Sequence, residues 1–226
     1  TQVIQVEYDE AASLQLSFAD TDYLSQRIDS SSALSGEFGI SYYSATLNTP
    51  SFNGSCGAFS YIGQEIDWLV APEVTLTARN AKNQTTEFAD VASYWPLTTA
   101  TMSTEFASNS YTETSTVNNN QVVTINDGTA AIENDLVAVD GQRSYQLVGQ
   151  SIRYNKSRTP DSPFNANVDL AFPANAFIDG NGVGVKDDVT DGSFKGITIE
   201  DIGGVELNYG RLTVSSNFGS ELENVP

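Results

Sequence analysis

The stretch that decides the fold class is residues 197–209, which read Ile-Thr-Ile-Glu-Asp-Ile-Gly-Gly-Val-Glu-Leu-Asn-Tyr. Apolar residues occupy every second position in both halves of this stretch: Ile197 and Ile199, then Val205, Leu207 and Tyr209. A period of two gives a strand one apolar face and one polar face. Such strands are typical of antiparallel sheets that pack by one face against a core.

The same alternation recurs along the chain, and amphipathic helical spacing is hard to find. Further examples are Leu14, Leu16 and Phe18; Val74, Leu76 and Ala78; and Val123 and Ile125. Turn-forming pairs separate these segments, at Asn53-Gly54, Asp127-Gly128, Asp140-Gly141, Asp179-Gly180, Asn181-Gly182 and Asp191-Gly192. The sequence therefore predicts an all-β protein, an antiparallel β-sandwich of immunoglobulin-like character with long loops and little helix.

The chain has 226 residues, enough for one large domain or two ordinary ones. Residues 28–36 are mostly small and polar and favour a boundary, while the two or three strands before them are too few for independent stability. We therefore interpret residues 1–30 as the end of a preceding β domain. Residues 31–226 would form one β-sandwich domain or two small sandwiches, and the chain is expected to be part of a longer protein.

The charge balance excludes some partners. The chain has 29 acidic and 10 basic residues, a net charge of −19. Such a field repels nucleic acid phosphates and anionic lipid. No stretch reaches the ~18 apolar residues of a membrane span. The charge suits a cation or a cationic partner, or it is simply solvated surface.

Histidine is absent from the sequence, which argues against most catalytic arrangements. Ser-His-Asp and Cys-His nucleophiles and nearly all catalytic zinc sites require an imidazole. We therefore expect no enzyme and assign no catalytic residue. Cys56, the only cysteine, is expected to be a buried structural thiol, or else to pair with a cysteine outside this chain.

The sharpest local signal for a ligand is the acidic loop, residues 179–191. Calcium requires six to eight oxygen ligands from closely spaced side chains and carbonyls. The candidate ligands are Asp179, Asn181, Asp187, Asp188 and Asp191. Calcium is the candidate cofactor for this loop, a plain acidic hairpin whose glycines serve only the turns is the alternative, and no other cofactor is expected. Asp9-Glu10 and Asp20-Thr21-Asp22 are weaker candidates.

Three aromatic residues are candidates for stacking against sugars: Trp68, Tyr94 and Trp95. Rings exposed in loops bind glycans, whereas rings in strands pack in the core. Both interpretations stay open at the level of the sequence.

Two stretches go beyond general β patterning. One is Cys-Gly-Ala-Phe-Ser-Tyr-Ile-Gly-Gln at residues 56–64, followed by the threonine-rich strand 74–81. The other is residues 207–222, Leu-Asn-Tyr-Gly-Arg-Leu-Thr-Val-Ser-Ser-Asn-Phe-Gly-Ser-Glu-Leu. In order and spacing they resemble the C-terminal domain of MshQ-like proteins, which are encoded with the mannose-sensitive haemagglutinin (MSHA) type IV pilus. Asn208 and Thr213 depart from the family pattern, where basic residues stand.

The resemblance implies a secreted or surface-exposed protein of a Gram-negative bacterium. Its implied function is non-enzymatic adhesion or scaffolding, with pilus or other surface-protein subunits, or host or surface glycans, as partners. The alternatives are a purely structural stalk domain and a carbohydrate-active enzyme. The resemblance also implies core or corner positions for Tyr61, Tyr209 and Phe218, and tight backbone at Gly63, Gly210 and Gly219.

Overall fold

The computed structural model describes residues 7–17, 19–29, 34–90, 94–97, 110–114, 123–126, 131–134 and 139–211. The strands in chain order are β1 (Ala12–Leu16), β2 (Ala19–Tyr23), β3 (Gln26–Asp29), β4 (Leu34–Phe38), β5 (Tyr42–Leu47), β6 (Ser51–Asn53), β7 (Phe59–Tyr61), β8 (Glu65–Val70), β9 (Glu73–Arg79), β10 (Ser110–Glu113), β11 (Val123–Asn126), β12 (Ala131–Asn134), β13 (Gln142–Val148), β14 (Ser151–Tyr154), β15 (Phe164–Asn165), β16 (Val168–Phe172), β17 (Ile197–Ile202) and β18 (Glu206–Asn208). Two short 3-10 helices, η1 (Glu87–Asp90) and η2 (Ala174–Phe177), complete the described elements.

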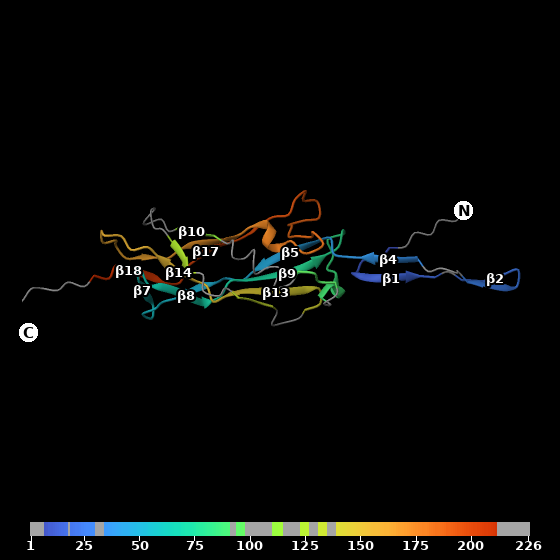
Figure 1. Ribbon diagram of the computed structural model, residues 1–226, viewed down its shortest axis with the longest axis horizontal. Coiled ribbons are helices and arrows are strands. Elements are labelled where there is room, and N and C mark those ends of the chain that lie inside the picture. Colours follow the sequence, from blue (N-terminus) through green and yellow to red (C-terminus); the bar gives the residue numbers. More distant parts are fainter. Residues whose placement is uncertain are drawn as a thin grey trace, which may run out of the picture.

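The strands form several sheets, and nearly all of the pairs are antiparallel, which confirms the predicted all-β fold class. Two sheets have four strands each, in the orders β12-β13-β9-β5 and β11-β14-β8-β6. Two more have three strands, in the orders β10-β16-β17 and β15-β18-β7. Figure 1 shows these sheets as one elongated body, with β5, β9 and β13 running along its length.

One hydrophobic core unites the four larger sheets. Each contributes fully buried side chains to the same cluster, for example Leu76 of β9, Ile152 of β14, Leu170 of β16 and Leu207 of β18. The alternation read from the sequence is the cause, because the inward residues of β9 and β17 are those of the predicted apolar faces. Burial of these faces supplies the main driving force for folding.

The first four strands form a long two-stranded arm that projects from one end of the body (Figure 1), and its described residues are 12–17, 19–29 and 34–38. β1 pairs with β4 from Ala12↔Phe38 onward, and β2 pairs with β3 farther out. Leu24 and Ser25 make the turn at the tip with positive φ angles of 51° and 63°, a twist that suits a tight hairpin. The boundary predicted after residue 30 lies outside the described residues, between β3 and β4, and the division into domains stays a prediction.

At the opposite end of the body, β18 pairs in parallel with β7 (Figure 1). The register places Leu207 opposite Ser60 and Asn208 opposite Tyr61. The described parts of the two stretches that carry the family resemblance, residues 56–64 and 207–211, are therefore neighbours in space although they are well separated in sequence. Gly210 permits this contact, since a Cβ there would lie 2.8 Å from the Tyr61 ring.

The predicted turn at Asp140-Gly141 gives a direct test of the packing. Gly141 has φ +72°, and a Cβ there would lie 2.5 Å from the Thr86 carbonyl oxygen. We expect Gly141→Ala to lower the free energy of unfolding by at least about 1–2 kcal/mol in chemical denaturation, through strained backbone and steric overlap. Gly192→Ala is the matched control, because Gly192 has an ordinary φ and open space around its Cα. Equal effects of the two substitutions would contradict this packing.

Candidate functional site

Asp179 follows η2 and organises the first half of the acidic loop. Its side chain is only 5% exposed. One carboxylate oxygen, Oδ1, accepts hydrogen bonds from the backbone N–H groups of Asn181 (2.8 Å) and Val183 (2.9 Å). The other, Oδ2, accepts a hydrogen bond from the Tyr43 hydroxyl at 2.8 Å. A buried carboxylate requires such partners, and Asp179 receives them from within the fold.

Tyr43 carries this contact into the centre of the protein. Burial raises the pKa of the Tyr43 hydroxyl above its ordinary value, and the negative charge of Asp179 raises it further. The Tyr43 ring packs against Trp95 with centroids 5.1 Å apart. Trp95 Nε1 donates a hydrogen bond to the Tyr145 hydroxyl at 2.6 Å, which itself donates to the Leu97 carbonyl at 3.0 Å. The acidic loop is thus anchored to a buried polar and aromatic network.

The second half of the acidic loop is a separate turn. Asp191 Oδ2 accepts hydrogen bonds from the backbone N–H groups of Asp187 (2.9 Å) and Asp188 (3.1 Å). Asp188 Oδ1 accepts one from the Thr190 N–H at 2.9 Å, and this bonding lowers the pKa of the Asp188 carboxyl. The Asp187 carboxylate pairs with Lys195. Between the two turns, Val185 runs parallel to Tyr43 of β5.

This geometry bears on the five predicted calcium ligands. The carboxylates of Asp179, Asp188 and Asp191 accept hydrogen bonds within the two turns. The Asp187 carboxylate pairs with Lys195, and Asn181 lies in the first turn. Among the described residues, no three His, Cys, Asp or Glu side chains are grouped so that they could hold a metal ion. Calcium at Asp179, Asn181, Asp187, Asp188 and Asp191 stays a prediction. The role that the contacts support is local ordering of the loop.

Two clefts flank the residues that join the arm to the body, Phe38–Ile40. The first, which we call the arm cleft, has a volume of about 390 Å³ and lies between the arm and the acidic loop. Its lining residues are Ser13, Glu37, Phe38, Gly39, Ile40, Tyr94, Asn181 and Val183. It combines two aromatic rings with a carboxylate and a carboxamide, the composition of a site for a small polar ligand.

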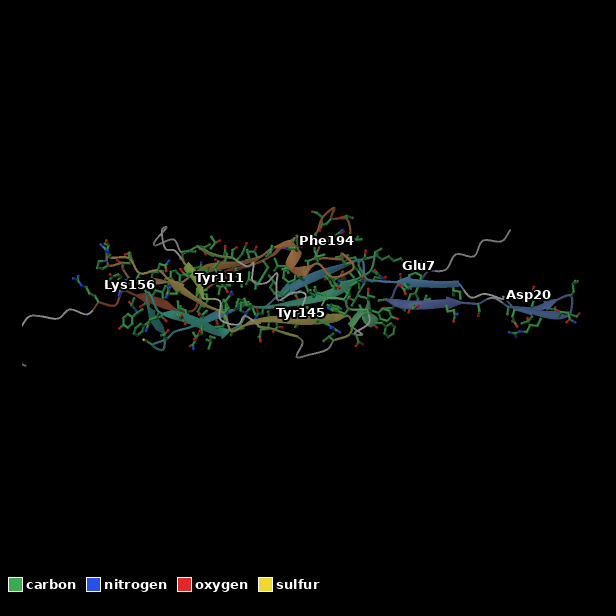
Figure 2. All side chains as sticks on the ribbon, viewed as in Figure 1. Glu7, Asp20, Tyr111, Tyr145, Lys156 and Phe194 are labelled. Atoms are coloured by element: carbon green, nitrogen blue, oxygen red, sulfur yellow. The ribbon has the colours of Figure 1, made fainter. Side chains whose placement is uncertain are left out.

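The second cleft, whose lining also includes Phe38–Ile40, has a volume of about 370 Å³ and a more ionic lining. Lys82 pairs there with Glu7 and, at 3.3 Å, with Asp9. The Glu10 carboxylate accepts a hydrogen bond from the Phe88 N–H at 3.2 Å. Figure 2 labels Glu7 at the base of the arm. These contacts hold residues 7–10, which precede β1, against the body.

The three aromatic candidates for sugar binding separate in the structure. Trp95 is 1% exposed and belongs to the core. Trp68 is half-buried and stacks on Phe52, with ring centroids 4.7 Å apart. Tyr94 alone of the three lines the arm cleft, where its hydroxyl accepts a hydrogen bond from the Ser13 N–H at 3.2 Å. Sequence reasoning missed Glu37 and Phe38, because nothing in the sequence places the end of β4 beside Tyr94.

At the end of the body formed by β7 and β18, the structure corrects the expectation for Cys56. Cys56 is exposed and free, so the prediction of a buried thiol is wrong, and pairing with a cysteine outside the chain stays a prediction.

Tyr61 is 40% exposed and lies on the surface against Gly210. Tyr209 is half-buried, and the Lys156 ammonium lies 4.6 Å from its ring centroid. Phe218 and Gly219 lie outside the described residues, and Gly63 has the positive φ, +96°, expected of tight backbone.

The fold and the clefts define the chain as an elongated all-β domain with a ligand-sized cleft at the base of a projecting arm. Residues 10–196 match the family described as DUF6701, third domain, and the chain belongs to this family. DUF6701 includes MshQ-like proteins. The match contains residues 56–64 but ends before residues 207–222. No curated protein and no solved structure matches the chain. The described part contains no helix long and apolar enough to cross a membrane.

The role of Asp179 separates structural ordering from metal binding. We expect Asp179→Asn to lower the free energy of unfolding by about 2 kcal/mol, because the amide cannot accept all three buried hydrogen bonds. The loss should be the same in chelator and in millimolar calcium, as measured by thermal melts. Asp67→Asn, at an exposed strand position, is the control and should have little effect. A loss that is seen only with calcium present would instead assign Asp179 to a calcium site.

Alkaline pH tests the buried tyrosines. Burial raises the pKa values of Tyr43, Tyr111 and Tyr154 above the ordinary value of 10.0. Their contribution to stability is therefore complete below about pH 10 and is lost as the pH rises toward the folded-state values. We expect the denaturation midpoint to fall above about pH 10, with fewer tyrosinates in the native than in the unfolded protein by ultraviolet absorbance. Identical native and unfolded titration curves would contradict the burial.

Proposed function

We propose that this domain is a non-enzymatic adhesion or scaffolding unit on the surface of a Gram-negative bacterium, within an MshQ-like protein associated with an MSHA-type pilus. Membership of DUF6701 supports the proposal, since that family includes MshQ-like proteins. The resemblance of residues 56–64 and 207–222 to MshQ-like sequences supports it further.

The observation that carries the proposal is the layout of the molecule. The arm and the β7–β18 pair lie at opposite ends of one elongated body (Figure 1). Glu7, at the base of the arm, and Lys156, near β18, are separated by most of its length (Figure 2). A rod of this kind suits a part that spaces or displays its neighbours along a surface protein.

The chemistry of the clefts favours binding over catalysis. A glycosidase of the usual kind needs two carboxyl groups flanking the scissile bond. The described lining of the arm cleft contains one carboxylate, that of Glu37. In the second cleft, Glu7 and Asp9 are held by Lys82, and Glu10 accepts a backbone hydrogen bond. The carboxylates of the second cleft therefore have structural roles.

A purely structural stalk is the second candidate, and the same elongated layout favours it. The two candidates differ in what the surface of the domain contributes. A stalk provides only length, so its side chains are exchangeable. An adhesion or scaffolding unit depends on particular surface groups of this domain.

A domain-replacement experiment tests the proposal. The region encoding residues 10–196 is replaced in the parent gene by an unrelated all-β spacer of similar length, and piliation and adherence are scored separately. We expect adherence, piliation or both to fall to the level of a full gene deletion. Complementation with the unaltered gene is the control. Wild-type behaviour of the spacer strain would favour the stalk, and wild-type behaviour of the full deletion would overturn the proposal.

A further inference from the structure

We propose that the arm cleft binds one unit of a neutral saccharide. This inference deepens the proposed function and rests on it. It concerns the cleft of about 390 Å³ between the base of the arm and the first turn of the acidic loop. The volume lies within the range of pockets that hold small ligands.

The aromatic rings of the cleft are held in place before any ligand arrives. Tyr94 is half-buried against the core, and its hydroxyl accepts a hydrogen bond from the Ser13 N–H at 3.2 Å. Phe38 is 38% exposed and packs edge-on to Tyr8, with ring centroids 5.5 Å apart. Rigid rings provide apolar contact area for the C–H face of a pyranose at little cost in conformational entropy.

The polar groups of the cleft complement sugar hydroxyls. Glu37 offers carboxylate acceptors, and Asn181 offers an amide donor and an acceptor. Within the described residues, neither side chain has a hydrogen-bond partner, and both residues are exposed. The backbone of Asn181 is fixed by Asp179 Oδ1 at 2.8 Å, so the loop is ordered without using the Asn181 carboxamide. Such preorganisation favours ligand binding.

The charge around the cleft selects against acidic sugars. The chain has a net charge of −19, and Glu37 lines the cleft itself. The carboxylates of Glu7, Asp9 and Glu10 line the neighbouring cleft. A sialic acid or uronic acid carboxylate would meet repulsion from Glu37, whereas a neutral hexose would not.

The test uses the 226-residue chain, displayed multivalently on streptavidin so that weak single-site binding is detected. It is applied to an array of neutral, sialylated and uronic-acid glycans, and the dissociation constant of the best neutral glycan is measured by calorimetry. Glu37→Gln and Asn181→Ala should each raise that dissociation constant by about threefold to tenfold, the effect of losing one hydrogen bond. The matched controls Glu200→Gln and Asn53→Ala, at exposed strand positions away from the cleft, should leave it unchanged.

Three results would overturn the inference: no neutral glycan bound, binding confined to acidic glycans, or cleft variants that bind like the parent while melting at the same temperature. These results are distinguishable from failure of the proposed function. If the spacer replacement abolishes adherence while the array shows no neutral glycan, the adhesion or scaffolding function stands and the saccharide site is rejected. If the spacer strain adheres and forms pili normally, the proposed function fails, and the array result then reports only on the chemistry of the cleft.

Discussion

The buried hydrogen bond between the Tyr43 hydroxyl and the Asp179 carboxylate is the contact on which the position of the acidic loop depends. It joins β5, in the middle of the body, to a loop more than a hundred residues later. Because Asp179 also accepts the N–H of Asn181, the same carboxylate fixes the residue that reaches the arm cleft. The buried carboxylate of Asp179 thus connects the core to the position of Asn181 on the surface. The three hydrogen bonds that Asp179 accepts offset the cost of its desolvation.

The lysines show how a protein with a net charge of −19 uses its few cations. Lys82 holds Glu7 and Asp9 at the base of the arm. Lys186 donates to the Asp191 carbonyl at 2.7 Å, and Lys195 pairs with Asp187 in the same turn. Lys156 donates to the Gly210 carbonyl at the opposite end. Each fixes one turn or chain crossing. Exposed pairs of this kind add little stability, so their main effect is on local geometry.

The sequence was informative where burial dictates a period of two. Val74, Leu76 and Ala78 are all buried on β9, as the alternation predicts, since a slip of one residue would expose the whole face. In the acidic loop the Asp-Gly and Asn-Gly pairs predict turns, and the structure has turns there. The hydrogen bonds of the loop could not be predicted, because a carboxylate near glycines suits either a metal or a backbone N–H. Cys56 is exposed on the surface although its type favours burial. The arm cleft was unpredictable because Glu37, Tyr94 and Asn181 come from three segments that meet only in the folded state.

The arm raises a question of stability that bears on the cleft. A two-stranded ribbon is marginal alone, and this one has an apolar face that includes Ala12, Leu14 and Leu16, which remain half-buried. Its base is secured by contacts with the body: Tyr94 with Ser13, Asn80 with the Asp9 carbonyl, and Phe88 with Glu10. β4 ends at Phe38, so the residues that line one wall of the cleft are the last residues of the arm. The shape of the arm cleft therefore depends on the attachment of the base of the arm to the body. Any ligand that contacts Phe38 and Asn181 together would stabilise the attachment of the arm by mass action.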